Sequence, residues 1–474
     1  MEWLTDPGYA TSRWVFQRTL AFVYLVAFLA AALQFRALIG QRGLTPVPRY
    51  LEYTEFRDAP SLFHYRYSDR IFAATAWVGV AIAGIALFGI TEAIPLWASM
   101  LVWAVLWILY MSIVNVGQIW YGFGWESLLL EVGFLAIFLG NASTEAPVLV
   151  LFLLRWVLFR LEFGAGLIKL RGDPCWRNLT CLYYHHETQP LPGPFSWHFH
   201  HLPKPLHRME VAANHFTQLV VPFGLFAPQP IASVAAAIIV VTQLWLMLSG
   251  NFSWLNGLTI VLALSVIEGS WWNRILSIDA PADPDPLPHW HVGIGIAVAV
   301  IVAVLSFWPV RNMLSSKQLM NHSFDPLHLV NTYGAFGSVT HTRFEVVISG
   351  TAARENLAEA EWKEYEFKGK PGDLARRPRQ IAPYHLRLDW LMWFAAISPT
   401  YAGPWLLPLA NKLLQGDRTT LKLFRINPFP DAPPAYIRAT MYEYRFTDRQ
   451  ERRSTGKWWN RTYIDEYLRP VSLD

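Results

Sequence analysis

Apolar residues form long runs between Val15 and about Trp308, whereas charged residues return at the frequency of soluble proteins from Asn321 onward. A helix that crosses a hydrocarbon core of about 30 Å needs about 20 mostly apolar residues. This rule predicts a polytopic α-helical membrane domain over residues 1–320, with about nine spans. The spans are expected near Trp14–Ile39, Arg70–Ile90, Ile94–Val116, Trp125–Gly140, Pro147–Leu170, Met209–Phe226, Ile231–Leu248, Phe252–Ile267 and His291–Trp308.

The pattern changes to alternation of apolar and polar residues in the C-terminal part of the chain. Arg343–Ile348, Trp362–Lys368 and Ile437–Phe446 repeat with a period of two and are rich in aromatic and β-branched residues. This pattern predicts antiparallel strands, so residues 321–474 are expected to form a β-rich, sandwich-like extramembrane domain. A helix is expected near Leu386–Ile397, either on the bilayer surface or in the core of this domain.

Composition and charge narrow the class of protein. The chain of 474 residues is 53% hydrophobic and only 16% charged, which is typical of a membrane protein. The net charge of +4 is small, and no basic run is interleaved with aromatic residues, so nucleic acid is not expected as a partner. The 23 Trp and 19 Tyr residues fit a protein with extensive membrane interfaces.

Several charged residues lie inside the predicted spans, where each costs about 2.5 to 3.5 kcal/mol at a helix centre. Arg155, Glu162 and Lys169 are spaced by seven and therefore share one helix face, with Arg160 on another face. Glu126 and Glu131 in the preceding span are the expected counter-charges. Three interpretations stay open: the charges pair and fix the helix register, Lys169 acts as a base with Glu162 beside it, or Lys169 reaches the membrane interface.

The only two cysteines, Cys175 and Cys181, lie in a loop at residues 171–208 that is rich in histidine and proline. A disulfide between them is the leading prediction, and it implies that the loop faces an oxidising compartment. A zinc site, a redox-active pair and two free thiols are the alternatives, but the spacing lacks the tight pattern of zinc ligands. No metal or cofactor is therefore predicted.

Three long blocks of the sequence resemble the lipase maturation factor family. The first is RLEFGAGLIKLRGDPCW at residues 160–176, which continues through Cys181 to His185, His186 and the run ETQPLP. The second is NTYGAFGSVT at residues 331–340, and the third is PRQIAPYHLRLDWLMW at residues 378–393. The first block makes Asp173, Trp176, His185 and His186 candidate functional residues of the loop.

This resemblance implies a membrane chaperone that helps secreted lipases reach their active form. The chain looks like a bacterial member of the family, so the bacterial inner membrane is expected, or the endoplasmic reticulum membrane for a eukaryotic chain. The family also implies an extracytoplasmic loop and C-terminal domain. The distribution of Lys and Arg argues for the opposite orientation, because these residues concentrate in connections on the same side as that domain.

A second and shorter likeness concerns mechanism. The segment AGLIKL at residues 165–170 is similar to the segment of vitamin K-dependent carboxylases that carries their essential lysine. The leading function is thus a non-enzymatic maturation factor with a secreted client protein, such as a lipase. The alternative is a membrane enzyme that uses Lys169 as a base on a lipid-soluble substrate, and a third reading is the binding of membrane lipid in a polar cavity.

Overall fold

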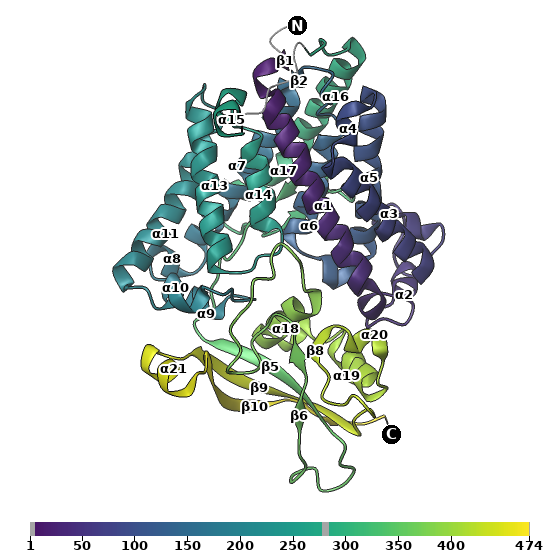
Figure 1. Ribbon diagram of the computed structural model, residues 1–474, viewed down its shortest axis with the longest axis vertical. Coiled ribbons are helices and arrows are strands. Elements are labelled where there is room, and N and C mark those ends of the chain that lie inside the picture. Colours follow the sequence, from purple (N-terminus) through teal and green to yellow (C-terminus); the bar gives the residue numbers. More distant parts are fainter. Residues whose placement is uncertain (1–4, 277–283, 474) are drawn as a thin grey trace.

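The computed structural model describes residues 5–276 and 284–473, so residues 1–4, 277–283 and 474 of the two expected domains lie outside the described part. Figure 1 shows helices at the end of the molecule that holds the N-terminus, and a sheet with further helices at the other end. The long helix α1 (Ala10–Leu38) packs along α3 (Asp69–Leu87), while α13 (Ile231–Ser249) packs against α14 (Leu255–Leu264).

Within the described residues, five helical stretches are long and apolar enough to cross a membrane. They are α1, α3, α5 (Leu96–Val116), α13 and the stretch His289–Leu314, which contains α16 (His289–Leu305) and α17 (Phe307–Leu314). The membrane character of the N-terminal part is confirmed, but the expected count of nine spans is not.

The other four expected spans differ from these five in length or in charge. Helix α6 (Gly124–Ala136) has 13 residues and therefore reaches only about 20 Å at 1.5 Å per residue. Helices α11 (Lys204–Leu219) and α14 are also short, with 16 and 10 residues. Helix α7 (Val148–Arg171) has 24 residues but carries several charged side chains. An apolar run marks burial against protein as readily as burial in lipid, which explains the overestimate.

The connections between the long helices contain short elements. The segment 171–208, expected to be a loop, forms three small helices: α8 (Pro174–Arg177), α9 (Leu182–Thr188) and α10 (Ser196–His200). The remaining short elements of this part are β1 (Thr5–Asp6), η2 (Pro7–Tyr9), α2 (Val47–Leu51), η3 (Leu62–His64), α4 (Ile90–Ala93), η4 (Gln118–Tyr121), β2 (Ala146–Pro147), α12 (Val221–Gly224) and α15 (Gly269–Leu276).

The C-terminal part contains one four-stranded antiparallel sheet with the order β10-β9-β5-β6. The central pair is β5 (Arg343–Thr351) and β9 (Tyr436–Phe446), in a register that places Val346 opposite Met441. The predicted strand at Trp362–Lys368 is divided into two short strands, β6 (Lys363–Glu364) and β7 (Glu366–Phe367). The other strands are β3 (His322–Ser323), β4 (Asn331–Thr332), β8 (Phe424–Ile426) and β10 (Trp459–Val471).

In place of the expected sandwich-like form, helices pack against the four-stranded sheet, and β3-β4 and β7-β8 form separate two-stranded sheets. Helix α18 (Arg387–Ile397) packs against β5, and α19 (Leu406–Leu414) packs against β9. Trp390 of α18 is only 3% exposed, which selects the core over the bilayer surface for this helix. A buried helix face supplies the apolar layer that a second sheet would supply in a sandwich. The remaining helices are η5 (Pro399–Tyr401), α20 (Arg418–Leu421) and α21 (Arg449–Thr455).

The two parts share a continuous core. The same cluster of buried apolar residues includes Phe28 of α1, Leu154 of α7, Val346 of β5 and Trp405 beside α19. In Figure 1, α18 lies between the helical part and the sheet. The C-terminal part is therefore packed onto the helices and is positioned to close any cavity that the helices leave open.

Candidate functional site

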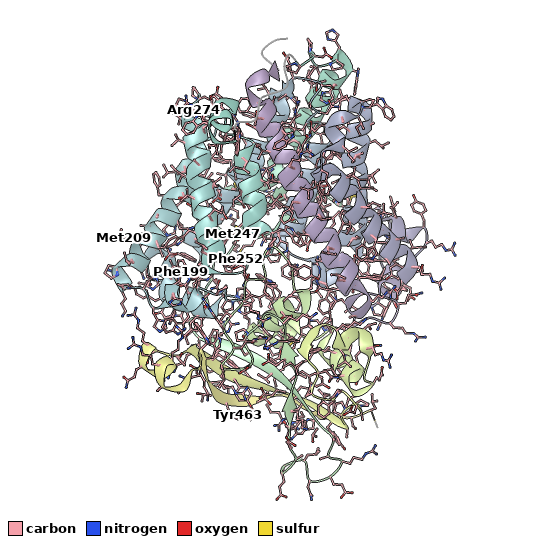
Figure 2. All side chains as sticks on the ribbon, in the orientation of Figure 1. Phe199, Met209, Met247, Phe252, Arg274 and Tyr463 are labelled. Carbon is pink, nitrogen blue, oxygen red and sulfur yellow. A yellow bond between two sulfur atoms is a disulfide. The ribbon has the colours of Figure 1, made fainter. Side chains whose placement is uncertain are left out.

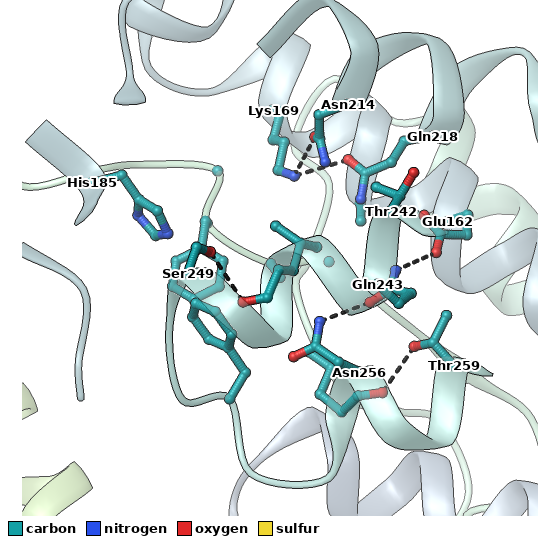
Figure 3. Close-up of a pocket in the computed structure, with 18 of the residues that line it drawn as sticks. Glu162, Lys169, His185, Asn214, Gln218, Thr242, Gln243, Ser249, Asn256 and Thr259 are labelled. Atoms are coloured by element: carbon teal, nitrogen blue, oxygen red, sulfur yellow. Dashed lines mark hydrogen bonds between the residues drawn. The ribbon is translucent and has the colours of Figure 1, made fainter. Parts of the chain in front are cut away.

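A cavity of about 720 Å³ lies between the helical part and α18. Its wall comes from α6, α7, α9, α11, α13 and α14, and from the segment around Gly334–Ser338. Apolar side chains provide most of the lining, and a few polar groups converge on it, as is typical of binding sites for small molecules. Figure 3 shows these polar groups, which include Glu162, Lys169 and His185.

The ammonium group of Lys169 is held by two amide oxygens of α11. Its Nζ donates to Asn214 Oδ1 at 2.9 Å and to Gln218 Oε1 at 2.8 Å (Figure 3). It also lies 4.9 Å from the centre of the Trp176 ring. Lys169 is 6% exposed and lines the cavity. Its charge is thus placed at the cavity wall and is satisfied by neutral partners.

Glu162 enters the same cavity two turns earlier on α7. Gln243 Nε2 of α13 donates to Glu162 Oε1 at 2.7 Å, and Asn256 Nδ2 of α14 donates to Gln243 Oε1 at 2.7 Å (Figure 3). The second carboxylate oxygen of Glu162 is buried and has no hydrogen-bond partner among the described residues. A chain of amides therefore connects three helices along one wall of the cavity.

The other predicted members of the intramembrane cluster lie elsewhere. Arg155 Nη2 donates to Tyr9 Oη at 2.8 Å and Nη1 donates to Leu225 O at 3.2 Å. Arg160 forms a buried ion pair with Glu131 and also donates to the carbonyl of Asn331. The structure therefore joins Arg160 to Glu131, whereas Arg155 does not join Glu162 and Lys169 in one column of charges.

Glu126 pairs with a residue of the C-terminal part. Arg387 Nη1 lies 2.7 Å from Glu126 Oε1 and 2.6 Å from Trp120 O, and the guanidinium lies over the Tyr121 ring. The hydroxyl of Tyr110 donates to the second oxygen of this carboxylate. Both charges are fully buried, and the pair connects the C-terminal part to α6.

The predicted disulfide between Cys175 and Cys181 is present in the structure. It closes a small cap at the end of α7, where Asp173 Oδ1 accepts a hydrogen bond from the backbone of Cys175 at 2.9 Å. Trp176 Nε1 in turn donates to Phe336 O at 2.7 Å. The cap is thereby attached to the C-terminal part and covers one end of the cavity.

His185 and His186 both line the cavity from α9. The ring of His185 packs against Phe336, with ring centres 4.9 Å apart, and lies parallel to Phe252. Burial, with smaller contributions from the charges of His186 and Lys169, lowers the pKa of His185 to about 3, so this ring is neutral near pH 7. His186 lies 3.8 Å from Glu210 of α11.

One side of the cavity is bordered by apolar side chains on the outer surface of the helices. Leu206 and Met209 of α11 and Val241 and Trp245 of α13 line the cavity, and each is between 44% and 67% exposed. Figure 2 places Met209 at the outer edge of the molecule. Val241 and Trp245 belong to α13, which is one of the five candidate spans, so this border is expected to contact membrane lipid.

Four residues of the site escaped sequence reasoning: Asn214, Gln218, Gln243 and Asn256. Each is a neutral amide, and a search for ionisable residues in apolar segments passes over amides. Gln243 and Asn256 do interrupt strongly apolar helices, and that interruption is a usable signal, since polar side chains inside membranes are costly and seek partners.

The fold and the site define a class: a polytopic membrane protein whose extramembrane part closes an amphipathic cavity between its helices. The sequence model described as the lipase maturation factor transmembrane domain matches residues 11–274. The model described as the lipase maturation factor C-terminal domain matches residues 329–469. The chain belongs to the lipase maturation factor family.

Curated relatives agree over nearly the full length. Lipase maturation factor 1 of Homo sapiens is 42% identical, covering 100% of this chain and 88% of the relative. Lipase maturation factor 1 of Mus musculus shows the same identity and coverage, and lipase maturation factor 2 of Gallus gallus is 28% identical over 97% of this chain and 81% of the relative. No solved structure matches. These findings do not support the alternative of a membrane enzyme with Lys169 as base.

Proposed function

We propose that this protein is a membrane-embedded maturation factor that assists the folding and assembly of a secreted client, and that the client is a lipase. The observation that carries this proposal is the 42% identity to lipase maturation factor 1 along the whole chain. The buried contacts between Glu126 and Arg387 and between Arg160 and Asn331 support it further. They hold the C-terminal part against the membrane part through buried charged contacts.

The C-terminal part and the cap at residues 171–208 lie on the extracytoplasmic side in this proposal. The disulfide between Cys175 and Cys181 supports this side, because disulfides persist in oxidising compartments. The distribution of Lys and Arg favours the opposite side, because the five candidate spans also leave the two basic connections and the C-terminal part on one side. The proposal follows the disulfide and the family. The membrane is the inner membrane of a bacterium, or the endoplasmic reticulum membrane of a eukaryotic cell.

Secretion of a lipase tests the client directly. The chain is expressed in cells that lack their own maturation factor, and the activity of a secreted lipase is divided by the amount of lipase protein. Specific activity is expected to rise with the wild-type chain and to stay at the baseline with Arg387→Met, which breaks the junction of the two parts. An unchanged specific activity, with the wild-type chain folded in the membrane, contradicts the proposal.

The cavity favours a second function of the same protein, the binding of one membrane lipid. Its apolar lining suits an acyl chain, and Lys169 supplies the cationic group that an anionic headgroup needs. The exposed apolar border formed by Met209 and Trp245 gives a lipid a lateral path into the cavity. A bound lipid would fill space that otherwise separates the helices from α18.

Mass spectrometry of lipids retained through purification in mild detergent tests this second function. The wild-type protein is expected to retain an anionic lipid at a constant ratio to protein, and Lys169→Met is expected to lose it. Arg311→Met, at an exposed position outside the cavity, serves as the matched control and should retain the lipid. Equal retention by all three proteins, or none by the wild type, contradicts the assignment.

A further inference from the structure

Three side chains with metal-binding atoms meet beside the border of the cavity. They are His186 of α9 and His207 and Glu210 of α11, and one ligand atom from each lies within 4.8 Å of the other two. Two imidazoles and one carboxylate form a ligand set that proteins use for zinc and related divalent ions. His186 is 1% exposed and His207 is 2% exposed, so two of the three ligands are fully buried.

The potential ligand atoms lack other partners. Both ring nitrogens of His186, Nδ1 of His207 and Oε2 of Glu210 are buried without a hydrogen-bond partner among the described residues. Buried polar atoms are nearly always paired, because each unpaired group costs about 1 to 3 kcal/mol. Lone pairs of imidazole nitrogens and of a carboxylate oxygen that converge on one point favour a positively charged ligand there.

The surrounding contacts orient these atoms as the outer contacts of metal sites do. Trp245 Nε1 donates to Glu210 Oε1 at 2.7 Å, which leaves Oε2 directed at the histidines. His207 Nε2 lies 3.3 Å from His200 O, so the tautomer that donates from Nε2 exposes the lone pair of Nδ1. A second hydrogen bond that fixes the tautomer and the ring is a regular feature of metal-bound histidine.

A second cluster with metal-binding atoms lacks these properties. Asp173, Cys175 and His341 also lie within 4.8 Å of one another. However, Cys175 is bonded to Cys181 and has no thiolate to offer. Asp173 caps α8, and the half-exposed His341 stacks on Tyr184. The cluster around Cys175 is therefore part of the structural cap, whereas His186, His207 and Glu210 have buried polar atoms without hydrogen-bond partners among the described residues.

We propose that His186, His207 and Glu210 bind one divalent ion of the zinc class. Three protein ligands leave one position of a tetrahedral ion open, and both His186 and Glu210 line the cavity. The open position is therefore available to a ligand in the cavity. The ion links the cap helix α9 to α11 and fixes one edge of the cavity border.

The site is tested by metal content and by cobalt spectroscopy on the full chain in detergent. Protein stripped with a chelator is titrated with Zn²⁺, and bound metal is measured by mass spectrometry; Co²⁺ replaces Zn²⁺ for absorption spectra. The wild type is expected to bind one equivalent and to show the intense visible bands of low-coordinate Co²⁺. Glu210→Gln and His207→Gln are expected to lose both signals.

Two further variants separate ligation from folding. Trp245→Phe removes only the donor to Glu210 and is expected to weaken Zn²⁺ binding about 10- to 100-fold while leaving one site. His215→Gln changes a histidine of the same helix that bonds to Trp176 O, and it should bind Zn²⁺ like the wild type. Failure of the folded wild type to bind Zn²⁺ or Co²⁺, or equal binding by Glu210→Gln, overturns the proposal.

Discussion

Arg160 and Glu162 are two residues apart on α7, yet they belong to regions with opposite properties. Arg160 is sealed in an ion pair with Glu131 at a packed junction. Glu162 faces a cavity and accepts its hydrogen bond from a neutral amide, Gln243. The difference shows that charges within one helix of a membrane protein can serve cohesion on one face and an open site on the other.

The packed junction reaches into the C-terminal part. Glu131 Oε2 accepts hydrogen bonds from the backbone and side chain of Asn331, at 3.0 Å each, and from the hydroxyl of Tyr333 at 2.5 Å. Glu126 is shared in the same way by Arg387 and Tyr110. The cavity, in contrast, offers Lys169 neutral partners, namely two amide oxygens and the face of the Trp176 ring. Loss of a charge should therefore be costly at the junction and inexpensive at the cavity.

The largest effect is expected from breaking the junction. Arg387→Met leaves the carboxylate of Glu126 buried without its cation, and removal of one partner of a buried ion pair costs about 3 to 5 kcal/mol. Thermal unfolding in detergent should show this loss, whereas Arg311→Met at an exposed position should change stability by less than about 0.5 kcal/mol.

The double change sharpens this test. Glu126→Gln combined with Arg387→Met removes both charges, so it should destabilise less than the sum of the two single changes. Strictly additive losses would show that the two residues act independently and would contradict an ion pair between Glu126 and Arg387.

A pH effect of about 3 kcal/mol is expected at the same junction. Burial, followed by the charge of Arg387, lowers the pKa of His385 to about 4, against about 6.5 in an unfolded chain. The unfolded chain thus takes up the proton first, so this contribution is fully present above pH 6.5 and is lost as the pH falls toward 4. His385→Gln should flatten stability in that range, and the exposed His322→Gln should not. An identical acid profile for His385→Gln would exclude His385 as the cause.

The cap over the cavity gives a smaller effect. Cys175→Ala together with Cys181→Ala removes a disulfide with a sequence separation of 6, for which chain entropy predicts a loss of about 2 kcal/mol. Hydrogen exchange should increase in α8 and α9 and stay unchanged in α18, because the bond closes the cap alone. Alkylation without reductant should leave both thiols of the wild type unlabelled. Labelling of both thiols in the wild type would show that the disulfide is absent, and it would contradict an oxidising compartment for the cap.

The sequence predicted the membrane part, the main strands β5 and β9, the disulfide and the family. It did not predict the partner of each charge, because Arg387 and Asn331 lie more than 150 residues from Glu126 and Arg160. A helical face can be derived from spacing, but contacts between distant segments depend on packing. The sandwich failed for the same reason, since nothing in the alternation of β5 shows whether a sheet or α18 covers it.

The smallest effect on stability is expected at the cavity, where Lys169→Met and Glu162→Gln provide the sharpest contrast with the junction. The partners of Lys169 are the oxygens of Asn214 and Gln218, and these face a cavity of about 720 Å³ in which water can replace the lost donor. Each change should therefore cost less than about 1 kcal/mol, because no buried charge loses a directly bonded ion partner. A coupling energy near zero between the two changes is expected in a double-mutant cycle measured by thermal unfolding. A coupling as large as that between Glu126 and Arg387 would make Lys169 and Glu162 a structural pair, and it would end the distinction between the two faces of α7.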